Sequence, residues 1–209
     1  LSKRVLKITG VKELINGYHN IIGDRIEAFS YLCVGVISRG TIIVRNINPI
    51  FLSSELNVLK KLGCSIKTEN NTISIKSKKV LKPMKITTGP YPKFATDNMP
   101  ALLAVLCTVN GKSEINETIF SNRFMAAPEL SRMGAIIKIK KNKAIINGQK
   151  KLIGADCISS DLRTTFSIIL GALAAKGISQ VQRVYHGLRG YYNLIGKLKK
   201  VGVNIKSSE

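Results

Sequence analysis

Apolar and polar positions along the chain follow one order three times. In each copy an apolar segment of helical length begins near an aspartate, and a short strand pattern led by a glycine follows it. An amphipathic helical segment comes next and ends at Gly63, Gly134 or Gly202, so these glycines recur about every 70 residues. That period is longer than the period of solenoid repeats. The pattern predicts three copies of a βαβαββ-type unit in one domain over 1–209, with units at about 1–79, 80–148 and 149–209.

The two helices of each unit differ in where they can lie. The first is apolar on nearly every side, which requires burial all round, whereas the second has a single apolar stripe such as Leu52, Leu56 and Leu59. We therefore expect an α/β (α+β) fold with the first helices inside and small sheets around them. The expected first helices are Asp24–Ser38, Asp97–Val109 and Asp161–Lys176, and the expected second helices are Leu52–Leu62, Met125–Met133 and Tyr191–Val201.

Strands are expected between and after these helices. The strand after each first helix is apolar enough to be buried, and two hairpins follow, with turns at Asn70-Asn71 and Lys141-Asn142. The third unit ends after one strand where the others have a hairpin, so its sheet has an open edge or takes a strand from another segment. The expected strands are Thr41–Arg45, Ser113–Asn116, Ser179–Arg183, Ser65–Thr68 with Thr72–Lys76, and Ala135–Lys140 with Lys143–Asn147.

Composition excludes several classes of protein. At 209 residues the chain can bury a sizeable core, and no apolar run reaches the ~18–20 residues of a membrane helix. We identify no signal peptide, because Leu1–Arg4 leads into a strand-like run. The four cysteines have no metal-ligand spacing and lie in apolar contexts, which predicts buried, reduced thiols in a cytoplasmic protein without metal or cofactor: Cys33, Cys64, Cys107 and Cys157.

The net charge of +21 suggests a nucleic-acid partner. However, the lysines are scattered along strand ends and helix faces, and aromatic residues do not interleave with them as base-stacking platforms would require. We therefore expect general basicity rather than a specific nucleic-acid site.

The stretch Ser159–Arg163 joins an expected strand to an expected helix. Asp161 can cap that helix, and Arg163 in its first turn can bind phosphate or carboxylate. Asp24–Glu27 and Thr96–Met99 occupy equivalent places in the other units. Charges as close together as those of Asp24–Glu27 usually pair with one another, so we expect that tract to be an inter-domain or structural ion-pair cluster rather than catalytic.

Six motifs in order resemble the enolpyruvyl transferases, and within that family the branch that acts on UDP-N-acetylglucosamine. The resemblance covers essentially the whole chain and implies the family's three-unit domain, described as an inside-out α/β barrel. It also implies that this is a C-terminal-type domain only, so that the N-terminal domain, with its phosphoenolpyruvate-handling residues, is missing or is a separate chain. The motifs are DRIEA at 24–28, YPKFATD at 91–97, ETIFSNRFM at 117–125, PELSRMGA at 128–135, DLR at 161–163 and YHGLRGY at 185–191.

The resemblance implies a role for particular residues. Asp97 matches the aspartate that contacts and deprotonates the acceptor hydroxyl, although a plain helix cap is the alternative. Ile119 matches a sugar-nucleotide contact through its backbone, or is simply a buried strand residue. Arg123 and Arg189 match arginines of the site, although surface salt bridges are the alternative. Asp161 and Arg163 match residues that line the cleft, and we count Asp97, Asp161 and Arg189 as the catalytic candidates.

Several positions depart from the family pattern, and two alternatives to this function stay open. The departures, together with the missing domain, lead us to expect no turnover by the chain alone. One alternative is the shikimate-pathway enolpyruvyl transferase, and the other is a non-catalytic remnant that binds nucleic acid through its charge. The departures are Phe29-Ser30, Asn98–Pro100, Ser121, Ala126 and Leu188.

Overall fold

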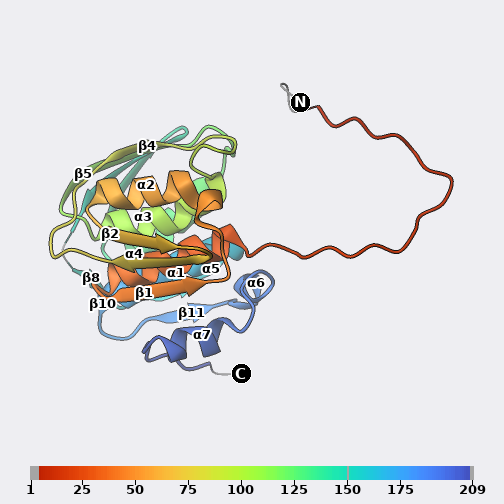
Figure 1. The fold of residues 1–209 in the computed structure, drawn as a ribbon. Helices are drawn as coiled ribbons and strands as arrows, with labels where there is room; N and C mark the ends of the chain where they lie inside the picture. The colour runs from red at the N-terminus through yellow and green to blue at the C-terminus, as the bar shows by residue number, and fades with distance from the viewer. Residues whose placement is uncertain (1–4, 150, 208–209) are drawn as a thin grey trace.

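Helices α1, α3 and α5 form the centre of the molecule, as the sequence predicts. The structure is a computed structural model, and residues 5–149 and 151–207 of it are described. Helix α3 packs against α5 and α1, and α1 also packs against α5 (Figure 1). Every residue of α3 is buried, which explains why no face of it is polar. These helices are α1 (Arg25–Ile37), α3 (Met99–Cys107) and α5 (Leu162–Ala174).

A three-stranded antiparallel sheet covers the centre in the first unit. Strand β3 (Thr72–Lys76) lies in the middle and pairs with β1 (Thr41–Arg45) on one side and β2 (Ser65–Glu69) on the other. The turn between β2 and β3 passes through Asn70 at φ 47°, as its turn sequence predicts. The prediction that β1 is buried is wrong: its residues are alternately exposed and half-buried, because one face of this antiparallel sheet, including Ile43, is turned to solvent.

The second unit has a four-stranded sheet in the order β4-β5-β7-β6. Strand β4 runs parallel to β5, whereas β5, β7 and β6 are antiparallel neighbours. The hairpin between β6 and β7 turns at Lys141, with φ 52°. The strands are β4 (Lys85–Thr87), β5 (Gly111–Asn116), β6 (Ile136–Lys140) and β7 (Lys143–Gly148).

The third unit carries two short parallel ladders in place of one sheet. Strand β8 pairs with β10, and β9 pairs with β11. Among the described residues no further strand joins β11, so of the two alternatives, an open edge or a strand from another segment, the described part of the chain shows the open edge. The described strands form separate sheets around the helices and no closed barrel. The ladder strands are β8 (Leu152–Ile153), β9 (Asp156–Ile158), β10 (Ala175–Lys176) and β11 (Gln180–Gln182).

The second helices end at the predicted glycines. Gly63, Gly134 and Gly202 have φ values of 112°, 87° and 89°, a backbone conformation that glycine adopts without strain. Short 3-10 turns precede helices α2 and α4, and a separate short helix, α6, precedes α7. The elements are η1 (Pro49–Leu52), α2 (Ser53–Leu62), η3 (Arg123–Met125), α4 (Ala126–Arg132), α6 (Tyr185–Leu188) and α7 (Leu194–Lys200).

The segment from Val5 to Gly23 departs from the sequence prediction. It contains neither helix nor strand and runs away from the folded part of the chain (Figure 1). A strand-like run was expected near the start, but a strand without a partner has no ladder hydrogen bonds to stabilise it. Leu1–Arg4 lie outside the described residues. The large apolar side chains exposed along the segment are Val5, Leu6, Ile8, Val11, Leu14, Ile15, Tyr18, Ile21 and Ile22.

All four cysteines are free and buried, as predicted. Burial raises the pKa of Cys64 to about 11 and that of Cys107 to about 12, so these thiols stay protonated near neutral pH. None of the described helices has the length and apolar character needed to cross a bilayer. The division of the chain into units near 79 and 148 remains a prediction.

Candidate functional site

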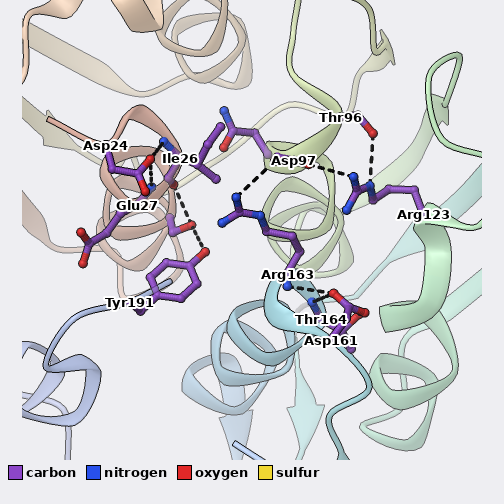
Figure 2. Close-up of polar contacts among 12 residues, drawn as sticks. Asp24, Ile26, Glu27, Thr96, Asp97, Arg123, Asp161, Arg163, Thr164 and Tyr191 are labelled. Carbon is purple, nitrogen blue, oxygen red and sulfur yellow. Dashed lines mark hydrogen bonds and ion pairs between the residues drawn. The ribbon is translucent and has the colours of Figure 1, made fainter. Parts of the chain in front are cut away.

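Asp97 lies just before α3 and is held between two arginines, Arg123 of η3 and Arg163 of α5. One carboxylate oxygen, Oδ1, accepts a hydrogen bond of 2.8 Å from Arg123 Nη2, and Oδ2 accepts one of 3.1 Å from Arg163 Nη2 (Figure 2). The Asp97 side chain is 37% exposed, whereas each arginine side chain is 16% exposed. The fold therefore brings together three of the predicted site residues in one accessible cluster with one negative and two positive groups.

Asp97 does not cap helix α3, so the simpler interpretation of this residue is wrong. It lies inside the 3-10 turn η2 (Thr96–Asn98), and the residue before the helix is Asn98, whose side chain makes no capping hydrogen bond. The helix starts at Met99 with Pro100 in its first turn, where the missing N–H costs nothing. Because the turn moves the helix start past Asp97, the carboxylate is free to face the arginines.

Asp161 caps helix α5, as predicted. Its Oδ1 accepts from the backbone N–H of Arg163 at 2.8 Å and of Thr164 at 2.9 Å (Figure 2). Burial acts to raise the pKa of Asp161, but hydrogen bonds from Thr164, Arg163 and Ser160 outweigh it and the pKa is lowered. The cap fixes the first turn of α5, and from that turn the Arg163 side chain reaches Asp97.

Arg123 is oriented by more than its ion pair. Its Nε donates to Thr96 Oγ1 at 3.2 Å, and its guanidinium lies 4.6 Å from the centre of the Phe120 ring. A planar guanidinium held by a hydroxyl, a carboxylate and an aromatic ring has one defined orientation. Arg123 does form a salt bridge, the alternative considered from the sequence. Its partner, however, is Asp97, and the pair is part-buried within the candidate site.

Ile119 is not a buried strand residue. It lies in the loop after β5 and is 48% exposed. Its N–H donates to Glu117 Oε1 at 2.8 Å, whereas no described residue donates to its carbonyl oxygen. A ligand that contacts the Ile119 backbone would therefore meet an acceptor rather than a donor.

Two buried acids support this region and were missed by the sequence analysis. Glu55 is 1% exposed and accepts from Ala95 N at 3.1 Å and Asn98 Nδ2 at 3.0 Å, so it holds both ends of the turn that carries Asp97. Glu117 is 2% exposed and binds the loop that follows it. The sequence offered only one sign of each: a single acidic residue among apolar ones. Glu55 lies beside the apolar face of α2, and Glu117 comes directly after β5.

Arg189 is not part of the cluster. It is exposed at the end of α6, where its backbone N–H donates to the Gly187 carbonyl, and no described hydrogen bond or ion pair includes its side chain. A catalytic role for Arg189 rests on the family resemblance alone.

The Asp24–Glu27 tract has partners elsewhere in the fold, in agreement with a structural role. Asp24 caps α1 by accepting from Ile26 N at 2.7 Å, and Glu27 pairs with Lys197 Nζ at 2.7 Å. Arg25 lies 3.9 Å from Glu55. The charges therefore pair with α1, α2 and α7 and not with one another.

Comparison with known proteins places this chain in a family. Residues 2–198 match the model of EPSP synthase (3-phosphoshikimate 1-carboxyvinyltransferase). The UDP-N-acetylglucosamine 1-carboxyvinyltransferase of Pelagibacter ubique is 44% identical over 98% of this chain and 49% of its own length. That of Campylobacter lari is 45% identical over 90% of this chain and 45% of its own length. The chain thus spans about half the length of the curated relatives it matches.

Solved structures agree with this assignment. The enolpyruvyl transferase NikO from Streptomyces tendae superimposes with a TM-score of 0.79 at 25% identity, over 89% of this chain and 44% of its own. An EPSP synthase from Acinetobacter baumannii superimposes with a TM-score of 0.68 at 19% identity, over 92% of this chain and 45% of its own, which supports the fold alone.

Proposed function

Because the chain belongs to the EPSP synthase family of enolpyruvyl transferases, we propose that it forms one side of the active site of a UDP-N-acetylglucosamine 1-carboxyvinyltransferase. Such an enzyme moves the enolpyruvyl group of phosphoenolpyruvate to the 3-hydroxyl of the sugar nucleotide, a step of peptidoglycan synthesis. The observation that carries the proposal is the placement of Asp97 between Arg123 and Arg163, 2.8 and 3.1 Å away. The names of the 39–45% identical relatives support this acceptor.

The cluster offers a base and two cationic groups, which this reaction needs on one side of the cleft. As the hydroxyl oxygen bonds to C2 of phosphoenolpyruvate, its proton passes to a base, for which we propose Asp97. The methylene carbon takes a proton from a donor outside this chain and becomes a methyl group, and the resulting tetrahedral intermediate then loses phosphate and one proton of that methyl group. The two arginines hold the carboxylate in one position and offer cationic charge to the phosphate and carboxylate of the substrates.

The remaining site residues have narrower roles in this proposal. Ile119 offers its carbonyl oxygen to a donor group of the sugar nucleotide, because its N–H is already bonded to Glu117. Asp161 acts by fixing the start of α5 and with it Arg163. The Arg189 side chain, exposed and without a described partner, is available to bind an anion when the second side of the cleft is present.

The other side of the cleft is expected from an N-terminal domain, in the same polypeptide or as a separate chain. The half-length match to the relatives supports this division. We therefore expect no phosphate release from the two substrates by the 209-residue chain alone. We also place the protein in the cytoplasm, which the free, buried cysteines support.

The proposal is tested by supplying an N-terminal half. The N-terminal half of the Pelagibacter ubique relative is joined to this chain, and phosphate release is measured with phosphoenolpyruvate and UDP-N-acetylglucosamine. We expect turnover that Asp97→Asn lowers by about 10²-fold or more. Turnover with 3-phosphoshikimate in place of the sugar nucleotide would instead support the alternative enzyme of the family. A well-folded fusion that turns over neither acceptor would overturn the enzymatic proposal.

A further inference from the structure

Glu117 is a buried acid without a cationic partner. It follows β5, is 2% exposed, and takes part in no described ion pair. Its burial is offset by four hydrogen-bond donors instead. They are Thr88 Oγ1 at 2.8 Å, Ile119 N at 2.8 Å and Phe120 N at 3.1 Å on Oε1, and Thr96 Oγ1 at 2.9 Å on Oε2. Burying a carboxylate costs desolvation free energy even when it is fully hydrogen-bonded, whereas an apolar side chain at the same place would carry no such cost.

The direction of these hydrogen bonds is determined by groups that can only donate. The Nε–H of Arg123 points at Thr96 Oγ1, so the hydroxyl proton of Thr96 is directed at Glu117. In the same way Thr118 N–H occupies the acceptor side of Thr88 Oγ1, which turns its proton toward Glu117. Glu117 therefore acts only as an acceptor, at the end of two ordered relays.

The relay through Thr96 leads to the candidate site. It runs from Glu117 through the Thr96 hydroxyl to Arg123 Nε, and Nη2 of the same guanidinium binds Asp97 at 2.8 Å. Thr96 is also the chain neighbour of Asp97 in η2. A change at the Glu117 carboxylate would therefore reach the guanidinium that holds the proposed base.

The second set of bonds shapes the loop after β5. Glu117 Oε1 takes the N–H groups of Ile119 and Phe120, which turns the loop around the carboxylate. Thr118 is tied to Thr88 by two hydrogen bonds, at 2.9 and 2.7 Å. With its N–H turned inward, Ile119 has only its carbonyl left for a ligand.

We propose that Glu117 is a positioning residue, which sets the orientation of Arg123 against Asp97 and presents the Ile119 carbonyl to a hydroxyl or N–H group of the sugar nucleotide. Its part in substrate binding rests on the proposed function, whereas its part in orienting Arg123 does not. Glutamine has the shape of glutamate but turns an NH₂ group toward donors, so Glu117→Gln breaks one relay without changing the volume.

The experiment follows the Arg123 Nε–H by ¹⁵N–¹H NMR in the full 209-residue chain, with its resonance assigned by Arg123→Lys. Thr96→Val removes the relay hydroxyl and Thr96→Ser keeps it. Glu114→Gln, a change at an acid on β5 that pairs with Lys85 and Lys143, is the matched control for Glu117→Gln. We expect Glu117→Gln and Thr96→Val to speed hydrogen exchange at Nε by roughly tenfold, and Thr96→Ser and Glu114→Gln to leave it within about twofold.

Titration with UDP-N-acetylglucosamine provides the second measurement. We expect the ligand to shift the Ile119 and Arg123 signals and Glu117→Gln to weaken binding by roughly tenfold. Unchanged exchange at Arg123 in both Thr96→Val and Glu117→Gln would overturn the proposal, and if Glu117→Gln does not fold, the two Thr96 variants decide it. The expected exchange pattern without any response to the ligand would uphold the orientation of Arg123 and contradict the proposed contact between the Ile119 carbonyl and the sugar nucleotide, whereas the function itself is decided by the turnover of the fusion.

Discussion

Removal of the Asp97 carboxylate should destabilise the protein, because it leaves two part-buried guanidiniums facing one another. Hydrogen bonds to a charged group contribute about 1.5–3 kcal/mol each when shielded from solvent. The Asp97 side chain is 37% exposed, so screening lowers this to about 1 kcal/mol for each of its two arginine contacts. Asp97→Ala should therefore lower the free energy of unfolding by about 2 kcal/mol and Tm by about 4–8 °C.

The same variant should gain a response to anions. Without Asp97, the guanidiniums of Arg123 and Arg163 form a site for phosphate, which fits a paired cationic fork. Phosphate at ten times its dissociation constant would return about 1.4 kcal/mol of stability. We expect phosphate to raise the Tm of Asp97→Ala above its value in chloride of equal ionic strength, and to have a smaller effect on the wild-type protein.

Thermal unfolding followed by circular dichroism measures both effects. Asp156→Ala is the control, because it removes an exposed carboxylate that has no described ion pair and changes the net charge by the same amount. A Tm of Asp97→Ala within about 1 °C of the Asp156→Ala value would refute the stabilising role of the Asp97 ion pairs. An equal response to phosphate in both variants would refute the idea that the two arginines form an anion site.

Three further predictions concern stability. Asp161→Ala removes the cap of α5 and should lower the free energy of unfolding by about 1 kcal/mol at pH 7, measured by urea unfolding. Because the folded-state pKa of Asp161 is lowered, the stability that its charge contributes is complete above the ordinary carboxyl pKa of about 3.9 and is lost as the pH falls below it. The difference in stability between wild type and Asp161→Asn should therefore shrink from pH 6 to pH 3, and a constant difference would contradict this. Gly63→Ala places a side chain at φ 112° and should cost roughly 1 kcal/mol in thermal unfolding, with no loss if the helix end can rearrange freely. Lys197→Met breaks the 2.7 Å pair with Glu27 and should cost at most about 1 kcal/mol, an effect that 1 M NaCl removes if the pair is electrostatic.

Local features of the fold followed from the sequence. Helix starts at Asp24 and Asp161, and helix ends at Gly63, Gly134 and Gly202, depend on capping and backbone conformation within one turn, so the residues themselves specify them. The apolar character of α1, α3 and α5 on every side likewise required a central position. The repeat of these local signals was enough to predict helices inside and sheets outside.

The tertiary structure alone decided how the candidate site is assembled. Asp97 has the local setting of a helix cap, yet its partners Arg123 and Arg163 lie 26 and 66 positions further along the chain. The packing of α3 against α5 brings Arg163 to Asp97, the contact of η3 with α3 brings Arg123, and no local pattern encodes either approach. The buried acids Glu55 and Glu117 resemble ordinary polar residues in the sequence, because their burial depends on donors supplied by other elements. The sequence therefore determined the helix caps and helix ends, which form within a few residues. The ion pairs of Asp97 depended on long-range packing, because their partners are far apart in the chain.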